Sequence, residues 1–137
     1  MEIPQIDRSS YLKGLLITAR KDNQLSETEI SIIKKFSARL GFSSDFFDET
    51  ISHLLDNKYI TEEPIKFSKT DIAQSFIEDG LKLALADDDV SENEISWLKE
   101  TAKVNTIDEE WVDKKMKEIK SKPHLISKMD FALFSLI

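Results

Sequence analysis

An internal repeat constrains this chain more than any other feature of its sequence. A shift of 65 residues aligns the two halves without a gap and places identical residues on one another. The identical pairs are Ala19 and Ala84, Asp22 and Asp87, Ser26 and Ser91, Glu27 and Glu92, Glu29 and Glu94, Ile30 and Ile95, Ser31 and Ser96, Lys34 and Lys99, and Asp48 and Asp113. Each copy therefore predicts the same series of elements: a helix, a short acidic turn, a second helix, a turn and a third helix.

The pattern within the repeat predicts an all-α fold. Only three glycines and three prolines occur in 137 residues, and no segment alternates apolar and polar residues as a strand does. Helical spacing of apolar residues predicts about seven helices. They cover residues 8–21, 27 to about 40, 44 to about 55, 69 to about 85, 92–104, 109–120 and about 124–135. We expect one domain over 1–137, with pseudo-repeated three-helix units at about 11–56 and 76–121 around a central helix, plus a C-terminal helix.

The helix that follows Ser68 is predicted to be the central one. Apolar residues cover most of its circumference, which is typical of a helix buried on several sides. Gly80 lies in its middle and costs about 1 kcal/mol relative to alanine, so we expect a close contact with another helix there. Asp7 is predicted to cap the first helix, and Gly41 to end the second in the left-handed conformation.

Composition excludes several classes of function. The chain has no cysteine, which rules out disulfides, thiolate nucleophiles and cysteine-based metal sites. Its net charge of −7 argues against a nucleic-acid partner, because phosphate binding needs clustered cations. The apolar run Phe131–Ile137 is far shorter than the ~20 residues of a membrane span, and the first residues do not resemble a secretory signal. We expect a cytoplasmic protein without membrane insertion; no residue pattern specifies its oligomeric state.

Charge is distributed unevenly along the chain. Residues 7–40 carry seven basic and four acidic residues, whereas residues 78–113 carry twelve acidic and three basic ones, a balance of −9. An acidic surface of this kind attracts a cationic partner, although exposed charges also serve simply to solvate helix faces. The residues predicted to form a negative interaction face for a protein partner are Asp88, Asp89, Glu92, Asp108, Glu109 and Glu110.

Two repeated acidic turns offer candidate ligands for a metal. Glu29 and Glu94 each lie three residues after a serine, the spacing of a capping box at a helix start. Capping gives no reason for Asp22 and Asp87, four residues before each serine. These aspartates either order the turns by accepting backbone N–H bonds, or bind Mg²⁺ or Ca²⁺ weakly together with Glu29 and Glu94. A full EF-hand is excluded, because Leu83 would occupy its first ligand position in the second copy.

The same motif carries a resemblance to a known family. A helix ending in Ala-x-x-Asp, followed by apolar-Ser-x-x-Glu, occurs at Ala19–Glu29 and again at Ala84–Glu94. It resembles the TerB-like family of tellurite-resistance proteins, which includes the N-terminal domain of a membrane-anchored J-domain co-chaperone. The resemblance spans roughly 11–120 and departs from the family at Asn23 and Asp88, where glycine is usual. It implies a seven-helix domain of bacterial stress response whose acidic residues are suspected of binding divalent cations: here Asp22, Glu29, Asp87 and Glu94.

Two classes of function follow from these patterns. The first is a non-catalytic, TerB-like interaction module that binds a protein partner; no catalytic or cofactor-binding residue is assigned to it. The alternative is a metal-dependent hydrolase in which Asp87, Asp88, Asp89 and Glu94 hold the metal. We favour the interaction module, because adjacent aspartates in a short turn diverge into solvent more readily than they converge on one ion.

Overall fold

A computed structural model describes residues 3–20, 27–56, 63–85 and 92–121. Within these ranges the chain forms α-helices and no strand, as predicted for an all-α fold. The described helices number six: α1 (Gln5–Arg20), α2 (Glu27–Arg39), α3 (Ser44–Asp56), α4 (Thr70–Leu85), α5 (Glu92–Val104) and α6 (Glu109–Ser121). About seven were predicted; the seventh, at about 124–135, lies outside the described residues. None of the described helices is long and apolar enough to span a membrane.

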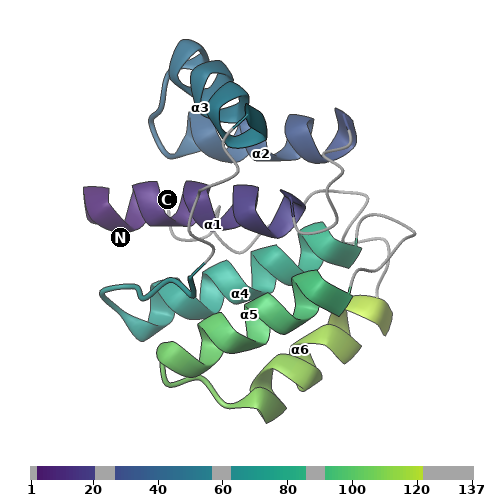
Figure 1. Ribbon diagram of the computed structural model, residues 1–137. Helices are drawn as coiled ribbons and strands as arrows, with labels where there is room; N and C mark the ends of the chain where they lie inside the picture. The colour runs from purple at the N-terminus through teal and green to yellow at the C-terminus, as the bar shows by residue number, and fades with distance from the viewer. Residues whose placement is uncertain (1–2, 21–26, 57–62, 86–91, 122–137) are drawn as a thin grey trace.

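The helix α4 lies at the centre of the described fold. It packs against α1 on one side and against α5 and α6 on the other, while α2 and α3 follow beyond α1 (Figure 1). Burial on several sides explains the wide apolar arc of this segment, whose largest side chains, Phe76, Ile72, Ile77 and Leu81, have no exposed surface. The prediction that this helix is central is therefore confirmed.

Two glycines allow the helices around α4 to approach closely. A Cβ atom on Gly80 would lie 2.6 Å from Leu98 Cδ2 of α5, so the contact expected there is present. A Cβ atom on Gly14 of α1 would lie 2.5 Å from Phe76 Cζ of α4. Both distances are far below van der Waals contact, so the absence of a side chain determines the helix spacing at both positions.

The helices α2 and α5 are each followed by a residue in the left-handed conformation. Gly41 ends α2 with φ of 94°, as predicted, and its nitrogen donates to Ala38 O. Thr106, 65 positions later, ends α5 with φ of 60°, an uncommon value for a β-branched residue. At the start of α3, Ser43 Oγ accepts the Phe46 N–H at 3.1 Å and so caps this helix.

The predicted start of the first helix is wrong. The helix begins at Gln5 rather than near Arg8, and Pro4 O accepts the N–H groups of Asp7 and Arg8. Asp7 is buried in the first turn, where its carboxylate accepts hydrogen bonds from the backbone N–H and hydroxyl of Ser68. Asp7 therefore anchors the segment that leads into α4 instead of capping its own helix.

The segment before α4 is also held at its other side. Asn105, at the end of α5, accepts the Phe67 N–H at 2.8 Å and donates to Ile65 O at 2.7 Å. A third bond joins its amide to Thr101 O of α5 at 2.8 Å. The bonds to Phe67 and Ile65 satisfy backbone groups of a segment that has no neighbouring strand to pair with among the described residues.

The helix boundaries recur at the spacing of the sequence repeat, but the packing of the two halves differs. The first and last residues of α4, α5 and α6 each fall 65 positions after those of α1, α2 and α3. However, α6 packs on both α4 and α5, whereas α3 packs mainly on α2. The side chains on α3 therefore contribute less to the described core, and Phe46 remains 45% exposed.

Candidate functional site

Only part of the predicted metal-binding set lies in the described residues. Glu29 and Glu94 are the third residues of α2 and α5, and each is only 3% exposed with an interaction partner within the chain. Asp22 and Asp87 lie outside the described residues, as do Asp88 and Asp89 of the hydrolase hypothesis. Within the described ranges, no three His, Cys, Asp or Glu residues form a group that could hold a metal ion.

The predicted interaction residues that are described all lie on the surface of α5 and α6. Glu92 is exposed in the first turn of α5, and Asp108, Glu109 and Glu110 are exposed where α6 begins. Charged residues of this sign are favourable at helix starts, because they face the positive end of the helix dipole. This local role places the carboxylates but does not bury them, so they remain accessible to a partner.

Two adjoining hollows lie between α5 and α6, with some of these carboxylates on their borders. The first, of 590 Å³, has Asp108 and Glu109 on its border, and the second, of 570 Å³, has Glu92. Ser96 and Lys99 line both hollows, so we refer to the pair as the α5–α6 groove. Apolar groups contribute to each: Ile107 to the first, and Ile95 and Met116 to the second.

Lys99 organises the middle of the α5–α6 groove. Its Nζ lies 3.1 Å from Asp113 and 3.3 Å from Glu109, so one side chain of α5 bridges two carboxylates of α6. The hydrogen bond to Asp113 is the main cause that raises the pKa of Lys99, and the bond to Glu109 adds to it. Within the described residues, Glu92, Asp108 and Glu110 form no ion pair, and two further basic side chains, Lys103 and Lys120, also line the hollows.

The sequence patterns missed the role of Lys99. Its only sequence signal is its repeat partner Lys34, and the repeat aligns Asp113 with Asp48 in the same way. An ion pair between two helices depends on their packing, which short-range spacing rules do not describe.

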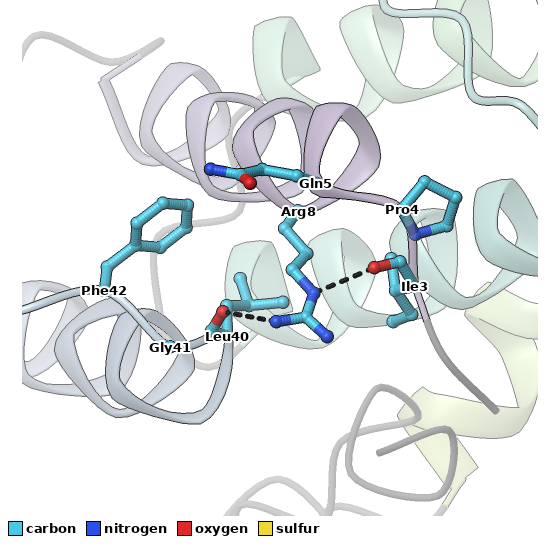
Figure 2. A pocket seen from close by; sticks show the side chains of 7 residues that line it. All are labelled: Ile3, Pro4, Gln5, Arg8, Leu40, Gly41 and Phe42. Atoms are coloured by element: carbon cyan, nitrogen blue, oxygen red, sulfur yellow. Dashed lines mark hydrogen bonds between the residues drawn. The ribbon is translucent and has the colours of Figure 1, made fainter.

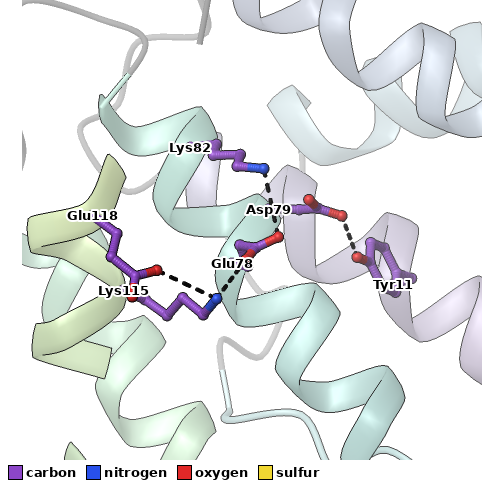
Figure 3. A network of polar contacts seen from close by, with 6 residues as sticks. All are labelled: Tyr11, Glu78, Asp79, Lys82, Lys115 and Glu118. Carbon is purple, nitrogen blue, oxygen red and sulfur yellow. Dashed lines mark hydrogen bonds and ion pairs between the residues drawn. The ribbon is translucent and has the colours of Figure 1, made fainter. Parts of the chain in front are cut away.

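A second set of polar contacts involves residues of α1, α4 and α6 (Figure 3). Lys115 of α6 lies 3.0 Å from Glu78 of α4 and 3.5 Å from Glu118, and Glu78 also pairs with Lys82 at 3.5 Å. Partial burial acts to lower the pKa of Lys115, but the hydrogen bonds and negative charges of Glu78 and Glu118 together outweigh it and raise the pKa. The spacing of Glu78 and Lys82, four residues apart on one helix, is the sequence signal for part of this network.

The core of this network is a fully buried pair. The Tyr11 hydroxyl of α1 donates a hydrogen bond to Asp79 Oδ2 of α4, and neither side chain has exposed surface. Burial, followed by the negative charge of Asp79, raises the pKa of Tyr11 well above its ordinary value of 10.0. Since both groups are sealed from solvent, their geometry suits a structural bond between two helices rather than proton exchange with a substrate.

Comparison with known proteins adds no further assignment. The chain matches no protein-family model, no curated protein sequence and no solved structure. Its functional interpretation therefore depends on the residues and surfaces described above.

Proposed function

We propose that this chain is a non-catalytic interaction module of the TerB-like type that binds a protein partner along the α5–α6 groove. The observation that carries the proposal is the position of three sequence-predicted carboxylates, Glu92, Asp108 and Glu109, on the borders of two adjoining hollows. Exposed acidic residues alone would serve solubility equally well. Their arrangement around a concave surface is what favours binding.

The chemistry of the groove selects the kind of partner. The carboxylates of Glu92 and Asp108, which form no ion pair among the described residues, attract a segment that carries lysine or arginine and accelerate its encounter with the groove. Lys99 forms ion pairs with Asp113 and Glu109. Apolar atoms of Ile95 and Met116 provide contact area for the stem of a long basic side chain. The proposed partner is therefore a protein segment with spaced basic residues.

The finer architecture and the acidic turns belong to the same proposal. The 65-residue spacing of the helix boundaries supports two pseudo-repeated three-helix units. The C-terminal helix that the sequence predicts at about 124–135 belongs to the same proposal. The TerB resemblance suggests a role in bacterial stress response. Two roles stay open for Asp22 and Asp87: ordering of the turns, or weak Mg²⁺ or Ca²⁺ binding with Glu29 and Glu94. Both glutamates already have an interaction partner within the chain, which favours the ordering role.

A charge-neutralised variant tests the binding proposal. The variant carries Glu92→Gln, Asp108→Asn and Glu110→Gln, which remove three negative charges and retain side-chain size. Asparagine still caps a helix, so α6 keeps its start. We expect proteins captured from the native host at low salt by the parent chain to be lost from the variant, and the captured proteins to carry basic segments.

A control variant with the same change in net charge distinguishes an effect of the groove residues from an effect of net charge alone. Asp45→Asn, Asp48→Asn and Glu49→Gln neutralise three exposed carboxylates of α3, on the far side of α1 from the groove. This control should capture the same proteins as the parent. Capture that is unchanged in the groove variant, or lost equally in both variants, would contradict the proposal. Circular dichroism melting curves verify that all three proteins are folded.

A further inference from the structure

A pocket between the start of α1 and the end of α2 contains a cation that forms no ion pair with a carboxylate among the described residues. Its described apolar lining comprises Ile3, Pro4, Leu40 and Phe42, and Arg8 is the charged residue among the described residues that line it (Figure 2). Its volume of 480 Å³ lies within the range of about 300–1,000 Å³ that is typical of ligand sites. This pocket is separate from the α5–α6 groove.

Backbone carbonyl groups hold Arg8 in place. Its Nε donates to Ile3 O at 2.9 Å and its Nη1 to Leu40 O at 3.3 Å. Leu40 follows the last residue of α2, so the guanidinium also meets the negative end of that helix dipole. These contacts account for the position of the side chain. They supply partial charges only, and no carboxylate of the described residues forms an ion pair with Arg8.

Part of the guanidinium remains available for a ligand. A guanidinium has five N–H donors, and the two bonds to carbonyl groups use two of them. Figure 2 shows the third nitrogen, Nη2, turned away from both carbonyl oxygens and without a hydrogen bond to the residues drawn. Gly41 lies beside the same guanidinium: a Cβ atom there would lie 3.6 Å from Arg8 Nη1 and within 4 Å of no other atom, so the residue at this turn places no side chain against Nη1.

An apolar wall continues outward from the cation. Phe42 stacks on Phe46 with ring centroids 5.1 Å apart and an interplanar angle of 19°. Phe46 is 45% exposed, although a phenylalanine in a monomeric core would be buried. The pocket therefore presents one positive charge beside an extended apolar surface.

We propose that this pocket binds a short segment of a protein partner in which an acidic residue adjoins an apolar one. The carboxylate forms a paired hydrogen bond with the open edge of Arg8, a geometry that arginine favours. The neighbouring apolar side chain contacts Leu40 and Phe42. A single arginine matches the single charge of a carboxylate, whereas a phosphate group carries nearly two charges and needs further donors. The proposal does not depend on the α5–α6 groove, so either site can fail alone.

Two peptides that differ only in a carboxylate against an amide test the proposal on the unmodified chain. The probes are N-acetyl-Leu-Glu-N-methylamide and its Leu-Gln counterpart, titrated while the backbone amide resonances of Gly41 and Phe42 are followed by NMR. We expect a Kd of about 1 mM for the Glu peptide and binding about tenfold weaker for the Gln peptide. Sodium acetate at the same concentration should not reproduce the shifts, because it lacks the apolar group.

Two substitutions locate the effect. Arg8→Gln should abolish the preference for the Glu peptide, whereas Lys13→Gln, which removes an exposed positive charge from the same helix, should preserve it. Equal affinities of the two peptides, shifts by acetate equal to those by the Glu peptide, or a preference that survives Arg8→Gln would overturn the proposal. If Arg8→Gln does not fold, the comparison of probes on the unmodified chain decides the matter.

Discussion

The buried hydroxyl of Tyr11 links α1 to α4 through its hydrogen bond to Asp79. Removing this one hydroxyl group tests how much the bond contributes to stability. Tyr11→Phe keeps the ring, which packs edge-on against Phe76 with centroids 5.3 Å apart. It withdraws a donor from a carboxylate that has no exposed surface. We expect the free energy of unfolding, measured with urea near pH 7, to fall by about 1–3 kcal/mol. An unchanged value would show that other donors satisfy Asp79.

The same pair predicts a dependence on alkaline pH. Burial and the charge of Asp79 raise the pKa of Tyr11, so the unfolded chain releases this proton near pH 10 while the folded chain retains it. The contribution to stability is therefore complete below pH 10 and decreases as the pH rises further. The difference in unfolding free energy between the parent and Tyr11→Phe should shrink above pH 10, by at most about 1.4 kcal/mol per pH unit. A difference that stays constant to pH 11 would contradict this assignment.

At the scale of elements, the two glycines that set the helix spacing should respond differently to a methyl group. Alanine gains about 1 kcal/mol of helix propensity at either position, and overpacking opposes this gain. At Gly14 the added atom meets the ring of Phe76, which is fully buried among other aromatic rings. At Gly80 it meets the terminal methyl groups of Leu98, which rotate more easily.

We therefore expect Gly14→Ala to lower the unfolding free energy by about 1–2 kcal/mol and Gly80→Ala to lower it less. Urea titrations of the two variants beside the parent provide the measurement. Stabilisation by Gly14→Ala would mean that α1 and α4 separate at little cost.

Local patterns predicted the elements well where the cause was local. The bounds of α5 agree with the prediction, and α6 differs by one residue, because caps and apolar spacing determine both. Asp7 shows the limit of such patterns. Its position suits an N-cap, but a bond to Ser68, 61 residues away in sequence, determines its role. Asn105 likewise binds a segment about 40 residues away, which no short-range rule anticipates.

The candidate site was predictable to the same extent. Charge counting found Glu92 and Asp108 to Glu110, since exposed carboxylates at helix starts are a local feature. It could not find the hollows between them or the bridge from Lys99 to Asp113, because these arise from the packing of α5 on α6. The sequence also offered no reason to predict a binding site at Arg8, since its pocket forms only where α1 meets the end of α2.

At the scale of the whole molecule, the two proposed surfaces lie in segments of different charge. The Arg8 side chain in the pocket belongs to residues 7–40, which sum to +3, and the α5–α6 groove lies mostly within residues 78–113, which sum to −9. Two segments of opposite charge could therefore bind at once without competing. Both interactions should weaken as salt is added, because exposed charges more than about 8 Å apart are screened at physiological ionic strength.

Thermal melting distinguishes the two roles proposed for the repeated aspartates Asp22 and Asp87, because each role predicts a different effect of metal on the stability of the whole chain. If Asp87 orders its turn through hydrogen bonds, Asp87→Asn should cost about 1 kcal/mol whether or not metal is present. If Asp87 binds a cation with a Kd of about 1 mM, 10 mM Mg²⁺ or Ca²⁺ should stabilise the parent by about 1.4 kcal/mol and leave the variant unaffected, because only the folded parent binds the ion. That stabilisation corresponds to a rise in Tm of about 4 °C.

We expect Asp87→Asn to lower stability equally with and without metal, because the adjacent helix start already contains a buried glutamate, Glu94, with a partner inside the chain. Asp22→Asn should behave in the same way, and a rise in the parent's Tm with metal that both variants lose would instead establish a cation site shared by the two turns.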